Sequence, residues 1–241
     1  MTDGFPNKPK ILRGAFVEFG LSLPPLVVVF QYNPVQLSRN RALTFGVPGD
    51  LGEANGPGQS SPGSRPTRDL REFHGGFSDL QRLQEQQLVT VAEQTIGFDI
   101  RLDATDRLDE SDTLTEQFGI APQIATLELM VQPKQESLLG SAVSALLGKP
   151  KGFSFTRRAN PPMVLFIFGR KRVLPVNINT MQITETEFSA DLNPLRATVA
   201  VGLTVIEGKN MPYLYSKAMT EAMSVLNLAS IVDVSNVVLP G

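Results

Sequence analysis

Alternation of apolar and polar residues is strongest in the C-terminal third of the chain, over Leu195–Ile206. Apolar side chains recur there at every second position, at Leu195, Ala197, Val199, Val201, Leu203 and Val205. A period of two is the spacing of a half-buried β-strand. Asn193-Pro194 before it is a turn signal, and Lys171–Phe188 is a long run of strand-forming residues. The pattern predicts two long strands joined by a turn at Ser189–Pro194.

Two shorter apolar runs echo each other far apart in the sequence. Leu26–Pro34 reads LVVVFQYNP, and Pro161–Gly169 reads PPMVLFIFG. Both are β-forming and both are stopped by turn residues. We expect Lys10–Phe19 to be a first strand, Leu26–Tyr32 a second that is buried on both faces, and Met163–Phe168 a buried strand near the long pair.

The middle of the chain predicts two more strands. Val35–Phe45 alternates, with arginines on its polar face, and is expected to be one strand. Leu88–Leu102 is expected to be another. In it Phe98, Ile100 and Leu102 share one face, and charged residues share the other.

Three segments of the chain have the pattern of a helix. Gly76–Gln87 has an N-cap candidate in Ser78, Gly119–Val131 has a fresh start at Pro122, and Pro212–Leu226 is amphipathic. Ser137–Leu147 is predicted to be a short apolar helix or a collapsed segment. Gly46–Arg68 is rich in Gly and Pro and predicts a long loop. That loop is either a tolerated surface insertion or an arm that orders on a neighbouring subunit.

These elements predict a β-rich α+β fold. We expect one β domain over residues 1–207, interrupted by a long loop at about 46–75. A helical extension over residues 208–241 is expected to follow it.

Composition excludes several classes of protein. The 241 residues include no cysteine, which rules out disulfides and cysteine-based metal sites. The formal net charge of -2 argues against general nucleic-acid binding, which usually needs a basic surplus. Apolar stretches are too short to cross a bilayer, and the first residues lack a secretory h-region. We therefore expect neither nucleic-acid binding nor membrane insertion.

The residues that a reaction would need are not grouped in any known pattern. His74 is the single histidine, beside two glycines, and is more simply a loop residue than a catalytic base. The acidic run over Asp99–Asp112 lacks the spacing of a calcium loop, so a solvated face or charge at a helix N-terminus is the better interpretation. We predict no enzyme activity, no metal and no cofactor.

Three motifs together resemble a known family. They are Phe30, Asn33 and Pro34 in FQYNP; Pro161, Pro162, Phe166 and Gly169 in PPMVLFIFG; and Pro194, Leu195, Arg196 and Ala197 in NPLRA. Their order and spacing resemble the tube-initiator, or inner-tube baseplate hub, proteins of phage-tail-like contractile injection systems. The resemblance spans roughly Lys10 to Glu207. The chain departs from it by having Phe168 where the family often has Trp, and by having too few residues after Glu207 for a LysM module.

The resemblance implies a tail-tube-like antiparallel β-sandwich or barrel with peripheral helices, forming a hexameric ring. It implies a structural component that joins the spike or baseplate to the inner tube. Its partners would be copies of itself, the inner tube protein, the spike or hub protein and other baseplate proteins. It would be assembled in the bacterial cytoplasm and then become part of the particle. A tube-terminating cap and a stand-alone β-sandwich binding module are the alternatives.

Four residues are expected at contacts between subunits: Arg196, Asn33, Arg170 and Arg172. Arg196 either lies solvated on an exposed strand face or anchors a carboxylate of the same or an adjacent subunit. The run Arg170–Arg172 faces either an acidic neighbour in a stack or only water. The long strands are expected to line the lumen or to join subunits, since ring closure removes unpaired sheet edges.

Overall fold

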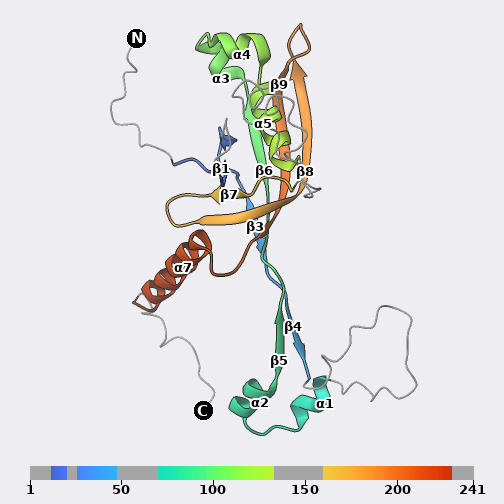
Figure 1. The fold of residues 1–241 in the computed structure, drawn as a ribbon, viewed down its shortest axis with the longest axis vertical. Coiled ribbons are helices and arrows are strands. Elements are labelled where there is room, and N and C mark those ends of the chain that lie inside the picture. The colour runs from blue at the N-terminus through green and yellow to red at the C-terminus, as the bar shows by residue number, and fades with distance from the viewer. Residues whose placement is uncertain (1–11, 21–25, 48–69, 133–159, 230–241) are drawn as a thin grey trace, which may run out of the picture. The chain divides into compact units, whose positions relative to one another are not determined.

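The computed structural model describes residues 12–20, 26–47, 70–132 and 160–229. They belong to two compact units, one of Met1–Arg39 with Thr95–Gly241 and one of Asn40–Gln94. The fold is a strand-rich mixture of α and β, as the sequence predicts (Figure 1).

The larger unit is built on one antiparallel sheet of seven strands. Their order across the sheet is β2-β1-β7-β8-β9-β6-β3. Their bounds are β1 (Ala15–Glu18), β2 (Val27–Val29), β3 (Leu37–Asn40), β6 (Thr95–Asp103), β7 (Val164–Ile167), β8 (Val173–Phe188) and β9 (Pro194–Val205). The long pair predicted from the alternation is β8 and β9, joined by the turn before Pro194. Ala197, Val199, Val201, Leu203 and Val205 are all buried, which confirms the predicted face.

Aromatic packing shows that the sheet curls over itself. Phe98 of β6 stacks on Phe166 of β7 with ring centroids 5.1 Å apart, although β8 and β9 lie between these strands in the sheet. Phe16 and Phe30 complete the cluster, with an edge-to-face contact at 5.1 Å. Such contacts add to the free energy gained by burying the rings.

The sheet nevertheless stays open. Strands β2 and β3 end the strand order, and the described residues form no closed barrel. The predicted sandwich or barrel is therefore one coiled, open sheet in a single chain.

The larger unit also contains four described helices. They are α3 (Thr105–Asp109), α4 (Thr113–Phe118), α5 (Ala121–Val131) and α7 (Met211–Ala229). Helix α5 buries Ile124, Leu127 and Met130 in the same core as the sheet. Helix α7 is fastened through Ser216, whose hydroxyl accepts from the Val173 amide and donates to the Val173 carbonyl. The predicted segment Ser137–Leu147 lies outside the described residues.

The smaller unit contains a two-stranded ribbon and two short helices. The ribbon pairs β4 (Leu43–Gly46) with β5 (Leu88–Val91), and the helices are α1 (Leu70–Gly75) and α2 (Leu80–Gln86). Most of the predicted loop over residues 46–75 lies outside the described residues, but residues 70–75 form α1.

Several element predictions need correction. Leu26–Tyr32 yields only the short strand β2, and Val27 and Val29 are about half exposed because β2 is an edge strand with one unpacked face. Val35–Phe45 divides into β3 and β4, which belong to different sheets. Leu88–Leu102 divides in the same way into β5 and β6. Asp79 rather than Ser78 caps α2, since its carboxylate accepts from the Gln81 amide.

The C-terminal helix predicted over Pro212–Leu226 is α7, which the structure groups with the main sheet. Among the described helices, none is both long enough and apolar enough to span a bilayer.

Candidate functional site

The FQYNP motif forms the connection that follows β2 and joins several parts of the larger unit. Phe30 is fully buried in the aromatic cluster. Asn33 accepts a hydrogen bond from the Gly14 amide at 2.9 Å and donates to the Leu12 carbonyl at 2.8 Å. Its amide therefore holds the chain just before β1. The oxygen and the nitrogen of this side-chain amide are therefore both hydrogen-bonded within the same chain. Asparagine suits this position because its short side chain can bond to nearby backbone groups as both acceptor and donor.

The two residues between Phe30 and Asn33 reach the end of β6. Gln31 accepts from the Asp103 amide at 2.9 Å, and the Tyr32 hydroxyl donates to Asp106 at 3.0 Å. The hydrogen bond to Asp106, helped by desolvation, raises the pKa of Tyr32 because it favours the protonated phenol. FQYNP thus ties the β1–β2 pair to the start of α3.

Arg196 joins the three long strands at one end of the sheet. From the central strand β9, its Nε donates to Asp103 of β6 at 2.8 Å and its Nη1 donates to Glu187 of β8 at 2.7 Å. The hydrogen bond and charge of Asp103 raise the pKa of Arg196. The structure therefore gives Arg196 two carboxylate partners in its own chain.

Asp103 is held in its charged form at this junction. Desolvation acts to raise its pKa, but hydrogen bonds from Thr105 and Arg196 outweigh it, and the pKa of Asp103 lies below its usual value. The same carboxylate accepts from the Thr105 amide at 2.8 Å and so fixes the start of α3.

Glu187 meets Arg196 through an unusual backbone conformation. Its φ is +56°, in the left-handed region that non-glycine residues rarely adopt. The regular pairing of β8 with β9 passes from Thr186–Arg196 directly to Phe188–Pro194. The irregular backbone lets Glu187 reach the face on which Arg196 lies.

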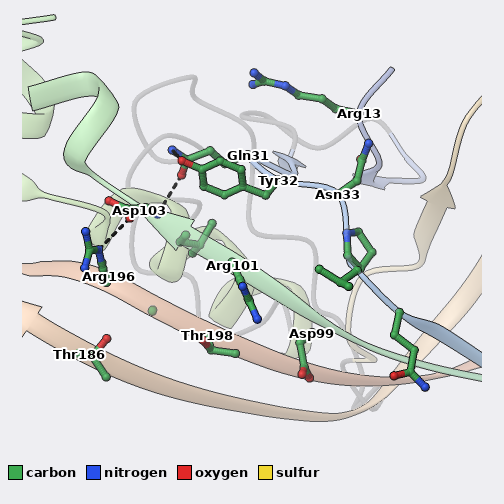
Figure 2. A pocket seen from close by; sticks show the side chains of 15 residues that line it. Arg13, Gln31, Tyr32, Asn33, Asp99, Arg101, Asp103, Thr186, Arg196 and Thr198 are labelled. Atoms are coloured by element: carbon green, nitrogen blue, oxygen red, sulfur yellow. Dashed lines mark hydrogen bonds and ion pairs between the residues drawn. The ribbon is translucent and has the colours of Figure 1, made fainter. Parts of the chain in front are cut away.

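A groove of about 1080 Å³ opens beside this junction (Figure 2). Both Asn33 and Arg196 line it, together with Arg13, Arg101 and Val35. In Figure 2, Arg13 and Asn33 stand on one side and Arg196 with Asp103 on the other. Within the described part of the chain, Arg13 and Arg101 have no hydrogen bond or ion pair. The fold thus brings together two of the four residues expected at subunit contacts.

The other two residues lie elsewhere, at the turn between β7 and β8. Arg170 is exposed, and its carbonyl accepts from the Tyr215 hydroxyl of α7 at 2.8 Å. Arg172 lies over the Phe168 ring, with its guanidinium carbon 5.7 Å from the ring centroid. Burial, followed by repulsion from Arg39, lowers the pKa of Arg172. Neither of these two arginines lines the groove that Asn33 and Arg196 share.

One face of the β8–β9–β6 layer is polar and open. Cross-strand register arranges it in rungs, which are Thr186–Arg196–Asp103, Thr184–Thr198–Arg101, Gln182–Ala200–Asp99 and Thr180–Gly202–Gly97. All of these residues are exposed or half-buried, whereas the alternate residues of β9 and β6 face the core. The layer therefore separates an apolar side from a side of mostly small, polar side chains.

Strand β8 has a long unpaired edge. Strand β7 pairs only with Val173–Val176, and β9 lies on the other side. From Asn177 to Phe188, no described strand lies on the β7 side. The centre of this edge, Thr180–Thr184, carries neither a charge nor a proline. Native proteins usually protect such an edge with charges, prolines or a covering element.

The described residues offer little to a reaction. No group of three or more His, Asp or Glu side chains among them could hold a metal ion. His74 lies 3.0 Å from the Gln87 side-chain nitrogen, in the smaller unit. The prediction that the chain is not an enzyme stays a prediction.

Sequence reasoning missed Gln31, Tyr32, Asp103 and Glu187. Asp103 belongs to the acidic run that the sequence predicts to be a solvated face or a helix N-terminal charge. Its carboxylate does accept from the Thr105 amide at the start of α3, but the pattern does not indicate that it is also a partner of Arg196. The register of two antiparallel strands could have found it, since Asp103 lies opposite Arg196 in the β6–β9 ladder. No sequence signal indicates the positive φ of Glu187.

Comparison with known proteins leaves the family open. No protein-family model and no curated protein matches the chain.

Proposed function

We propose that this protein is a structural ring component of a phage-tail-like contractile injection system, joining the spike or baseplate to the inner tube. The proposal rests on the resemblance of its three motifs and on one structural observation. That observation is the edge of β8 over Asn177–Phe188, with which no described strand pairs and whose centre, Thr180–Thr184, carries no charge. An edge of this length favours pairing with another chain, and ring closure is the arrangement that leaves no edge free.

The direction of the strands supports head-to-tail pairing of copies. Strands β8, β9, β6 and β3 are consecutive in an antiparallel sheet, so their directions alternate. Because four strands alternate in direction, the first and the last, β8 and β3, run in opposite directions. Strand β3 of one copy can therefore pair antiparallel with β8 of the next copy. Around a rotation axis, this pairing gives a continuous antiparallel barrel. The polar face of the β8–β9–β6 layer would line its lumen, because the opposite face is already filled by the core.

Paired substitutions on the polar face test this proposal. Thr184 lies on the unpaired edge strand and Thr198 lies directly opposite it on the central strand. Lysine is a common protector of strand edges. We expect Thr184→Lys combined with Gln182→Lys to give monomers. We expect Thr198→Lys combined with Ala200→Lys to retain rings.

The measurements are mass by light scattering and negative-stain imaging, with and without co-expressed tube and baseplate proteins. Six-fold rings of the unmodified protein, lost only in the edge variant, support the proposal. Absence of rings under all these conditions would contradict it. A cap at the far end of the tube is the second candidate, because pairing of the same strand edges would form a ring at either end of the tube.

A further inference from the structure

The groove beside the Arg196 junction contains two arginines that make no contact with another described group. Arg13, before β1, and Arg101, on β6, both line the groove and are exposed. They lie on different walls of it (Figure 2). Within the described residues neither makes a hydrogen bond or an ion pair, whereas Arg196 is already bonded to two carboxylates. Positive charge is therefore free at two places in the groove.

The connection between β2 and β3 supplies main-chain donors to the same groove. Residues 31–36 line it, and their main-chain amides donate to no group among the described residues. The preceding amide, that of Phe30, in contrast donates to the Gly14 carbonyl at 2.8 Å. Pro34 has no N–H, so the other amides of this connection are left for a ligand or for water.

One apolar side chain of this connection is almost fully exposed. Val35 lines the groove and is 91% exposed. Most of the other lining side chains are polar, whereas pockets for small organic ligands are mostly apolar. An exposed valine among charges and amides gives a ligand one apolar contact. The lining therefore suits a polar chain that carries an occasional apolar side chain, as a peptide does.

Carboxylates around the groove restrict the charge that it can accept. Asp103 is bonded to Arg196, and Asp106 accepts from Tyr32. Asp99 lines the groove and has no ion pair with another described residue. A polyanion such as DNA, with a charge on every unit, would meet these carboxylates as well as the free arginines. A ligand with few, separated negative charges avoids them, and a groove of about 1080 Å³ has room for an extended segment.

We propose that this groove binds an extended acidic segment of a partner protein. Carboxylates of the segment bond to the guanidinium groups of Arg13 and Arg101, whose forked donors match a carboxylate. Main-chain carbonyls of the segment accept from the amides of residues 31–36, and an apolar side chain covers Val35. Arginine clusters that recognise acidic motifs are a recurring mode of peptide binding. The inference goes beyond the proposed function and does not depend on ring formation, because one chain supplies every lining residue.

Binding of labelled peptides tests the site. The probes are fluorescent peptides of serine, threonine and valine that carry two glutamates at a series of spacings, with both ends blocked. Matched probes carry glutamine or lysine in place of glutamate, and a single-stranded oligonucleotide supplies the polyanion. We expect fluorescence anisotropy to show binding of at least one glutamate probe. The glutamine, lysine and oligonucleotide probes should bind at least about tenfold more weakly.

Loss of the two free arginines should remove this preference. We expect Arg13→Ala combined with Arg101→Ala to weaken binding of the glutamate probe at least about tenfold, because both charge-assisted contacts are lost. Lys209→Ala combined with Lys217→Ala is the control. It removes the same charge from exposed residues outside the groove and should leave binding unchanged. Circular dichroism checks that both variants are folded.

Substitutions at Val35 separate a specific site from a general attraction between charges. Val35→Asp places a carboxylate in the groove, whereas Val35→Asn has nearly the same shape as the aspartate and no charge. The side chain is almost fully exposed, so both variants should fold. We expect Val35→Asp to bind the glutamate probe several-fold more weakly than Val35→Asn, because the added charge repels the peptide.

Several results would overturn the proposal. They are glutamate probes that never bind, glutamine probes that bind as tightly as the glutamate probes, an arginine variant that binds like the lysine control, and Val35→Asp binding like Val35→Asn. Oligonucleotide binding as tight as that of the glutamate probe would also overturn it, by assigning the groove to nucleic acid. Failure of the proposed function is distinguishable, because it removes the rings and leaves peptide binding in place.

Discussion

Arg196 of β9 donates to Asp103 of β6 across 2.8 Å and ties the central strand to its neighbour where the sheet ends. The same guanidinium holds Glu187 of β8, so one side chain spans the three strands that carry the polar face. A forked, permanently charged donor suits this geometry better than the single point charge of lysine.

Removing Arg196 should weaken the end of the sheet without unfolding the protein. We expect Arg196→Ala to lower the free energy of unfolding only slightly, because the ion pair is partly exposed and screened by solvent. The variant should stay soluble but form rings less well, because the strand end is no longer fixed. Urea denaturation and light scattering measure the two effects. Arg101→Ala on the same face is the matched control, and intact rings in Arg196→Ala would argue against this role.

Acidification should remove the stabilisation that Asp103 supplies. Its pKa is lower in the folded state than in the unfolded state, so its contribution is present above the unfolded-state value, near ~3.9. The contribution is lost as the pH falls from there through the folded-state pKa. We expect Asp103→Asn to flatten this part of the pH dependence, measured by urea denaturation between about pH 5 and 2.5. Asp99→Asn is the control, and an unchanged slope in Asp103→Asn would refute the assignment.

The amide of Asn33 should matter more for the fold than its exposure indicates. Asn33→Ala removes one acceptor and one donor at the segment before β1. We expect a loss of roughly 1–2 kcal/mol in unfolding free energy, because the Gly14 amide is left without its partner. Asn33→Asp should lose less, since it keeps the acceptor. Equal stability of Asn33→Ala and the unmodified protein would show that water replaces both bonds.

Gly119 should tolerate no side chain. Its φ is +56°, and a Cβ there would lie 2.2 Å from the Pro194 carbonyl oxygen. Gly169 has a similar φ of +72° but open space around it. We expect Gly119→Ala to be poorly soluble or to unfold well below the temperature at which Gly169→Ala unfolds. The difference between them isolates the steric clash from the backbone preference that both share. Matching melting temperatures would show that the hairpin end can move aside.

Leu192 offers the opposite case, a position where a polar residue should stabilise. Leucine is disfavoured at its φ of +61°, whereas asparagine adopts this region readily. We expect Leu192→Asn to raise the unfolding free energy by about 1 kcal/mol, because it relieves the unfavourable backbone conformation. Thermal unfolding measures the change. A variant no more stable than the unmodified protein would contradict this account.

Local pattern was sufficient for the elements that alternate strictly. The β8–β9 pair, the buried face of β6 and helix α7 follow from a period of two or of 3.6 in the sequence, because burial of one face imposes that period. Prediction failed where burial depends on neighbours far along the chain. Leu26–Tyr32 reads as a strand buried on both faces, but only Val27–Val29 forms a strand, and this edge strand leaves Val27 and Val29 half exposed.

The candidate site divides in the same way. The turn motifs that place Asn33 and Arg196 are visible in the sequence by themselves, because they reflect local backbone chemistry. Only the tertiary structure decided that these two residues line one groove, that Asp103 and Glu187 hold Arg196, and that most of β8 has an unpaired edge. Each of these depends on strand order and register, which bring together residues that no local spacing relates.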